Sequence, residues 1–237
     1  TLLDEDVSKK IAQAGKETKR LAIQTGISTE QINKGYYQVV SAFGETSDSY
    51  DILQKATENA RAGNVAVADS VSILSTVMKG YDSVNAETAK KVSDLGFMTV
   101  KLGETEFPAL AKNMGKVIPL AGAMSAEMEE VFGAMATLTG VTGDTSVVST
   151  QLRGVFSALT KPTAQMEQTI KALGYESGKA MIESEGLQGT LEMLRRASGG
   201  SEQRLAQMFG RVEALNAVLA LTGPQAESFT EKTAAMY

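Results

Sequence analysis

The side chains that carry out most enzymatic chemistry are scarce in this sequence. It contains no Cys and no His among its 237 residues. Thiolate nucleophiles, zinc-thiolate sites and Ser-His-Asp or Cys-His catalysis are therefore excluded for this chain, because each needs one of these two residue types. Among the groups that remain for acid–base or metal chemistry, carboxylates gather at residues 4–6, 127–130 and 183–185.

Glu127 and Glu130 have two possible interpretations. Neighbouring carboxylates can share a proton or a divalent cation. However, Ser125 is suited to be a helix N-cap, and it would place both in a first turn, where the helix dipole favours negative charge. No Asp-x-Asp-x-Asp-Gly calcium loop occurs in the sequence. We therefore expect a structural role, no cofactor, no metal and no enzymatic activity; the alternative is a carboxylate-dependent hydrolase.

The sequence also lacks a phosphate-binding loop. None of its three Gly-Lys pairs, at residues 15–16, 115–116 and 178–179, has both the earlier Gly and the following Ser or Thr that such a loop needs. The segment from Gly140 to Asp144 instead predicts a turn between helices, with Asp144 or Thr145 as the next N-cap.

Charge and hydropathy exclude two further classes. The net charge is −5 and no basic block is present, so we expect no direct sequence-specific binding to nucleic acid. No apolar run approaches the roughly 20 residues of a membrane-spanning helix, so we expect no membrane span. The chain starts at Thr1 and soon turns acidic, so we expect no signal peptide and interpret it as a fragment of a longer protein.

The elements that position these groups are predicted to be helices. Val67, Val71, Leu74, Met78 and Tyr81 recur at spacings of 4, 3, 4 and 3, which places them on one helical face. Similar spacing occurs in three other sets: Met128, Val131, Met135 and Leu138; Met166, Ile170 and Leu173; and Leu205, Phe209, Val212, Leu215 and Leu219. Ser28 and Gln31 fit a capping box.

Gly and Pro interrupt nearly every helical stretch, which excludes a long coiled-coil rod. We predict an all-α fold, a compact multi-helix domain of about ten Gly/Pro-punctuated amphipathic helices. Its expected parts are a main helical domain at residues 1–174, a Gly-rich connector at 175–200 and a C-terminal helical segment at 201–237.

Two stretches about fifty residues apart carry a family resemblance. Residues 149–162 read Ser-Thr-Gln-Leu-Arg-Gly-Val-Phe-Ser-Ala-Leu-Thr-Lys-Pro, and residues 208–223 read Met-Phe-Gly-Arg-Val-Glu-Ala-Leu-Asn-Ala-Val-Leu-Ala-Leu-Thr-Gly. With the segments at 26–31, 53–63 and 91–105, they form an ordered series that resembles the phage tail tape measure family. Between residues 175 and 200 the resemblance fades.

The resemblance implies a structural role in tail assembly, tail length determination and genome ejection. The implied partners are tail tube and tail tip proteins, tail assembly chaperones and other copies of the chain, and the implied location is the tail lumen of the virion after assembly in the host cytoplasm. Contact residues are expected on two helical faces and beside them: Leu152, Arg153, Val155, Phe156 and Leu159, and Phe209, Arg211, Val212, Leu215 and Leu219.

The length that this chain can span depends on whether it is extended or compact. A continuous helix of this length would span roughly 355 Å, at 1.5 Å per residue, whereas a compact domain has a radius of gyration of about 18 Å. The broken helices favour the compact form, so we expect this region to nucleate assembly, anchor an end or serve ejection. The alternative function is a helical signalling or adhesin-like interaction module of a bacterial surface protein.

Overall fold

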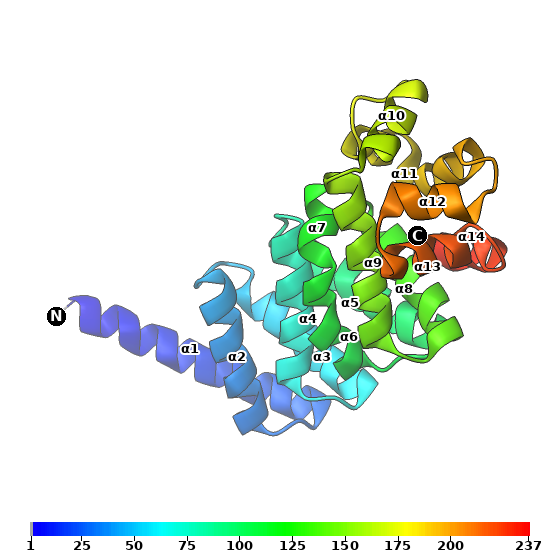
Figure 1. Ribbon diagram of the computed structural model, residues 1–237. Helices are drawn as coiled ribbons and strands as arrows, with labels where there is room; N and C mark the ends of the chain where they lie inside the picture. Colours follow the sequence, from blue (N-terminus) through cyan, green and yellow to red (C-terminus); the bar gives the residue numbers. More distant parts are fainter. Residues whose placement is uncertain (1) are drawn as a thin grey trace. The chain divides into compact units, whose positions relative to one another are not determined.

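Helices make up the part of the chain that the structure describes. This computed structural model describes the backbone of residues 2–237 and the side chains of residues 11–237. Fourteen α-helices and one 3-10 helix lie in this part, and no strand does (Figure 1). The all-α prediction is confirmed. None of the helices in residues 2–237 has both the length and the apolar character that crossing a membrane requires.

Two of the helices beyond the predicted ten are short helices that prolines start. Helix α6 (Phe107–Asn113) and helix α7 (Ile118–Ala123) each have a Pro in the first turn, at Pro108 and Pro119. Proline suits this position, since the amide hydrogen that it lacks would have no partner within the helix. The 3-10 helix η1 (Met114–Lys116) joins them.

One compact unit comprises residues 1–79 and 83–93. It contains four helices and the first part of a fifth: α1 (Leu2–Thr25), α2 (Thr29–Phe43), α3 (Ser49–Gly63), α4 (Val67–Gly80) and α5 (Ala86–Leu102). The Ser28 hydroxyl accepts a hydrogen bond from the Gln31 amide at 3.4 Å, so the predicted N-cap is confirmed. Ile32, Leu53 and Leu74 are fully buried in the core of this unit.

The second unit comprises residues 80–82 and 94–237. Besides the second part of α5, α6, η1 and α7, its helices are α8 (Met128–Thr142), α9 (Thr145–Thr160), α10 (Ala164–Ala172), α11 (Gly178–Ala197), α12 (Glu202–Phe209), α13 (Val212–Leu221) and α14 (Ala226–Ala234). Helix α11 occupies most of the predicted connector at 175–200. The division at residues 174 and 200 stays a prediction.

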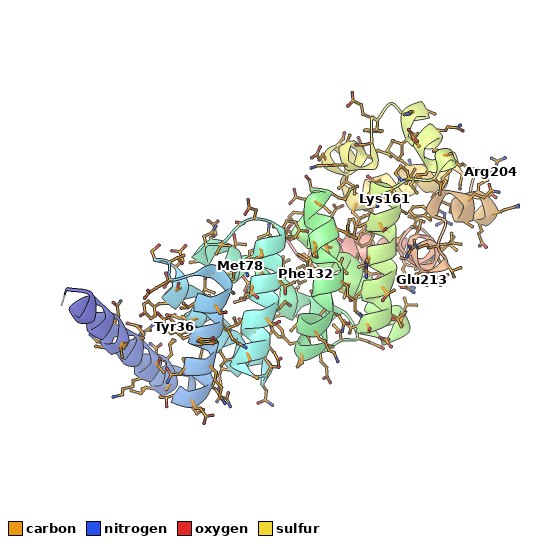
Figure 2. The ribbon with its side chains drawn as sticks, turned by 60° about the vertical axis from the view of Figure 1, so that its left-hand side comes forward. Tyr36, Met78, Phe132, Lys161, Arg204 and Glu213 are labelled. Carbon is orange, nitrogen blue, oxygen red and sulfur yellow. The ribbon has the colours of Figure 1, made fainter. Side chains whose placement is uncertain are left out.

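Helix α8 lies at the centre of the second unit. Every residue from Met128 to Thr139 is buried, as expected for a helix that has apolar or small residues on all sides. It packs against α9, α11, α13 and α14, and Phe132 lies among the side chains of neighbouring helices (Figure 2). The hydroxyls of Thr137 and Thr139 donate to carbonyls of the preceding turn at 2.8 and 2.7 Å, which satisfies them inside the core.

Small residues on α8 allow this close packing. A Cβ atom on Gly133 would meet the Thr233 hydroxyl and would lie 3.0 Å from the Thr233 Cα of α14. On the same helix, a Cβ atom on Gly140 would meet only the Lys232 ammonium at 3.3 Å, which is the end of a flexible side chain. The two glycines therefore differ in what surrounds them, although both are helical.

We expect Gly133→Ala to lower the free energy of unfolding by about 1–3 kcal/mol, because α14 must move to admit the methyl group. Gly140→Ala is the matched control on the same helix, and its higher helix propensity should leave stability unchanged or raise it by up to about 1 kcal/mol. Urea unfolding of the 237-residue chain measures both. Equal stability of the two variants would contradict the packing described here.

Candidate interaction surface

The first predicted contact face lies in the interior of the second unit. Leu152, Val155, Phe156 and Leu159 are at most 2% exposed, so this side of α9 faces the core. Asp144 starts the helix, as predicted: its carboxylate accepts hydrogen bonds from the amides of Ser146 and Val147 at 2.8 and 3.0 Å. In the folded chain these four apolar side chains therefore hold helices together and are not available to a partner.

The second predicted face is divided between two helices. Gly210 has a φ of 66°, in the left-handed region, and it ends α12 after Phe209. The hydroxyl of Thr163 donates to the carbonyls of Gln207 and Met208 at 3.1 and 3.0 Å, which caps the same helix end. The prediction that the apolar residues from Leu205 to Leu219 share one helical face is wrong, because the periodic spacing continues across a glycine that turns the backbone.

The predicted contact residues of α13 differ in burial. Val212 is 68% exposed, and Leu215 and Leu219 are half-buried. The buried side of this helix consists instead of smaller residues: Ala214, Ala217, Val218 and Leu221. Of the apolar residues predicted for contact, Val212 is therefore the one that the folded chain exposes most.

Arg153 and Arg211 line the same small hollow on the surface. A Cβ atom on Gly154 would lie 3.2 Å from the Ala214 amide nitrogen, so α9 and α13 approach closely at this point. This approach brings the two arginines to one place, because Arg153 directly precedes Gly154 and Arg211 lies three residues before Ala214. The hollow has a volume of about 210 Å³, and Thr150, Ser157 and Glu213 also line it.

This arrangement suits recognition of an anionic group. Both arginines are exposed, and within the described residues neither forms an ion pair. Guanidinium groups bind carboxylates through paired N–H donors. With the adjacent exposed Val212, they form what we call the α9–α13 patch: Arg153, Arg211 and Val212.

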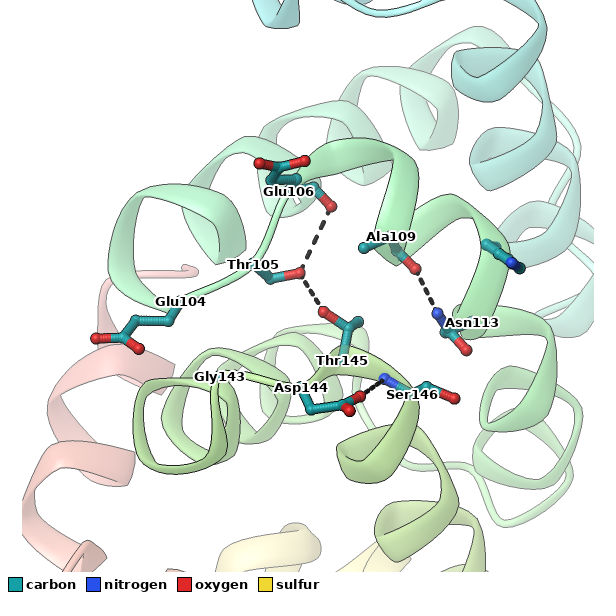
Figure 3. Close-up of a pocket in the computed structure, with 10 residues that line it drawn as sticks. Glu104, Thr105, Glu106, Ala109, Asn113, Gly143, Asp144, Thr145 and Ser146 are labelled. Carbon is teal, nitrogen blue, oxygen red and sulfur yellow. Dashed lines mark hydrogen bonds between the residues drawn. The ribbon is translucent and has the colours of Figure 1, made fainter.

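Another hollow, shown in Figure 3, is built from helix ends. It measures about 630 Å³ and lies between the starts of α6 and α9. The hydroxyls of Thr105 and Thr145 lie 2.6 Å apart and tie the two starts together. Asp144 is occupied as the N-cap of α9, and among the described side chains no group of three metal-ligating residues occurs. The contacts here are those of a structural junction.

The carboxylate of Glu130 has a structural role that the sequence did not reveal. Glu130 is 8% exposed, and its two oxygens accept hydrogen bonds from the amides of Leu187 and Gln188 at 2.7 and 3.1 Å. These amides follow Gly186, where α11 is kinked with a φ of 72°. Glu130 therefore caps the second half of α11, and a carboxylate suits these otherwise unpaired amides.

The start of α8 also differs from the prediction. Glu127, and not Ser125, occupies the N-cap position and is exposed. Ser125 has a φ of 57°, and its hydroxyl donates to Glu183 at 3.0 Å. The assignment of Glu130 to the first turn of this helix is confirmed.

The acidic residues at 183–185 have partners nearby, and those at 4–6 lie outside the side chains that the structure describes. Glu183 also forms an ion pair with Lys179 at 3.7 Å. Glu185 accepts a hydrogen bond from the Tyr175 hydroxyl at 2.6 Å, which holds the pKa of this carboxyl below its ordinary value. The side chains at residues 4–6 lie outside the described residues.

Comparison with known proteins relates this chain to a family. Residues 11–210 match the family described as phage-related minor tail protein. The chain is 24% identical over 227 residues to a probable tape measure protein of Clostridium phage phiCD119, covering 91% of this chain and 24% of that relative. It is also 24% identical over 224 residues to the tape measure protein of Pneumococcus phage Dp-1, covering 91% of this chain and 19% of that relative.

The chain is much shorter than either of these relatives. The chain spans about a quarter of the length of the first curated relative and about a fifth of the second. No solved structure gives a significant match.

We expect Glu130→Gln to lower the free energy of unfolding by about 1–3 kcal/mol, because an amide group offers one acceptor oxygen where two amide donors need partners. Glu127→Gln is the control, since that exposed side chain makes no capping hydrogen bond. Urea unfolding measures stability, and hydrogen exchange at the amides of Leu187 and Gln188 reports the local effect. Unchanged exchange at both amides in Glu130→Gln would contradict the capping role.

Proposed function

Since the chain belongs to the phage-related minor tail protein family, we propose that it acts within a tape measure protein in tail assembly, tail length determination and genome ejection. The match over residues 11–210 carries this proposal. Two relatives with tape measure names align with nine-tenths of the chain and support it. In this proposal the chain lies in the tail lumen of the virion, after assembly in the host cytoplasm, and catalyses no reaction.

The helix lengths favour assembly and ejection over direct measurement of length. The longest helix, α1, has 24 residues, which corresponds to about 36 Å at 1.5 Å per residue. Left-handed glycines and first-turn prolines separate the helices. A ruler segment would need one long uninterrupted element. We infer that this region nucleates the tail, anchors one of its ends or helps to release the genome.

The α9–α13 patch is the proposed contact surface for tail partners. Its two arginines lack acidic partners within the described residues, and Val212 adds exposed apolar area. Candidate partners are tail tube and tail tip proteins, tail assembly chaperones and other copies of this chain. The buried residues of α9 support the patch from within by fixing the position of Arg153.

Deletion of residues 26–222 from the parent gene tests the function. We expect either failure to form tails or tails of normal length that do not deliver DNA, because a set of compact units adds little length. Electron microscopy and infectivity assays distinguish these outcomes. Tails shortened by about 300 Å would show an extended ruler segment, at 1.5 Å per deleted residue. Fully infective particles of normal length would refute a tail function for this region.

Charge reversal tests the patch without deleting the fold. The double variant Arg153→Glu and Arg211→Glu should lower the yield of infective particles at least tenfold, because it places like charges against an acidic partner. Arg61→Glu is the matched control, since Arg61 on α3 is also exposed and has no ion pair within the described residues. Equal yields from both variants, with folding verified by circular dichroism, would exclude the patch as a contact surface.

A further inference from the structure

A basic hollow lies where α11 ends. It has a volume of about 420 Å³, within the range of ordinary ligand sites. The lining residues are Glu192, Arg195, Arg196, Gly199, Gly200 and Thr222. The hollow thus places two guanidinium groups close together in a chain whose net charge is −5.

Arg195 is held in position but is not neutralised. Its Nη1 donates to the Thr222 hydroxyl at 3.3 Å, and that hydroxyl donates in turn to the Val218 carbonyl at 2.6 Å. A Cβ atom on Gly223 would lie 3.0 Å from Nη1, so the glycine lets the guanidinium pack against the backbone. Among the described residues no carboxylate forms an ion pair with Arg195. Its remaining N–H donors are available to a ligand.

A third arginine reaches the same place from the next helix. Arg204 on α12 is exposed (Figure 2), and its Nη1 lies 3.8 Å from the position of a Cβ atom on Gly199. It forms no ion pair within the described part of the chain. Arg196, in contrast, pairs with Glu192 at 3.3 Å. Two guanidinium groups, of Arg195 and Arg204, therefore remain without a counter-charge.

Stabilisation of the helix end does not account for these arginines. Basic side chains in a last turn often satisfy unpaired carbonyls. Here the carbonyls of Leu194, Arg195 and Arg196 already accept hydrogen bonds from the backbone amides of Ser198, Gly200 and Gly199. The Ser198 hydroxyl also donates to the Arg195 carbonyl at 2.7 Å. Arg195 therefore lines the hollow without being needed to satisfy these carbonyls.

We propose that this hollow binds an acidic peptide segment of a partner protein, with carboxylates on Arg195 and Arg204. A guanidinium group pairs with a carboxylate through two parallel hydrogen bonds. The backbone of Gly200 has nothing within 4 Å of its Cβ position, so a peptide can approach the main chain closely. This inference goes beyond the proposed tail function and does not depend on it.

A nucleic acid fits this surface less well than a short peptide. The hollow has no aromatic lining residue for base stacking. A duplex carries one charge per roughly 1.7 Å of its axis and extends well beyond three arginines. The rest of an acidic chain would repel it, whereas a short acidic peptide meets only the basic hollow.

Binding of an end-capped hexaglutamate peptide to the 237-residue chain, measured by calorimetry in 50 mM salt, tests the proposal. We expect Arg195→Gln with Arg204→Gln to weaken binding at least tenfold. Arg204→Gln alone, at an exposed position that leaves the core intact, should weaken it at least threefold. Arg61→Gln removes the same charge from the other unit and should leave the affinity within twofold. The amide signals of Gly199 and Gly200 should shift on titration.

Three results would overturn the proposal. The first is no binding of hexaglutamate, or equal binding of hexaglutamate and hexaglutamine. The second is equal affinity in the wild-type chain and the double variant. The third is tighter binding of a 12-base-pair duplex than of hexaglutamate with shifts at the same two glycines, which would assign the hollow to nucleic acid. None of these measurements involves tails, so their failure would leave the proposed function untouched.

Discussion

The second unit depends on the burial of α8 from Met128 to Thr139. A helix without a solvent-facing side must contact its neighbours all around, and large side chains on every side would keep those neighbours apart. Gly133 allows α14 to approach, and the residue directly after α5 is also a glycine: a Cβ atom on Gly103 would lie 2.9 Å from the Ala136 carbonyl oxygen. Close packing in a protein interior tolerates little added volume. The small residues of α8 thus determine where the surrounding helices lie.

Burial of this helix also removes a carboxylate near its start from water. Glu130 lies near the amino end of α8, and burying an unpaired carboxylate would cost several kcal/mol. The amides after Gly186 offset this cost because they supply two hydrogen bonds to the charged group. Gly186 is necessary for the contact: a Cβ atom there would lie 2.6 Å from a Glu130 oxygen. One carboxylate therefore links α8 to the kink of α11, 57 residues away along the chain.

Sequence patterns predicted what depends on local chemistry. The all-α fold follows from 3.6-residue periodicity, and the caps at Ser28 and Asp144 follow from the hydrogen bonds that short polar side chains make. Periodicity failed at Gly210, because a spacing of apolar residues carries no information about the backbone angle between them. The contact of Glu130 with α11 was not predictable either, since it depends on tertiary packing between segments that no local pattern connects. The same holds for Arg153 and Arg211, which line one hollow because Gly154 lets α13 approach α9.

Burial also determines which predicted residues can meet a partner. The apolar face of α9 has the composition of a contact surface, but its four large residues already hold the second unit together. A partner could reach them only by opening this core, and exposing a single such side chain costs about 1.5–3 kcal/mol. Arg153 and Arg211 can be reached without that cost. The residues of the two stretches at 149–162 and 208–223 thus have two roles. The apolar ones maintain the position of α9 and α13, and the arginines beside them present charge on the surface. A substitution inside α9 would therefore affect partner binding indirectly, through the placement of Arg153 relative to Arg211.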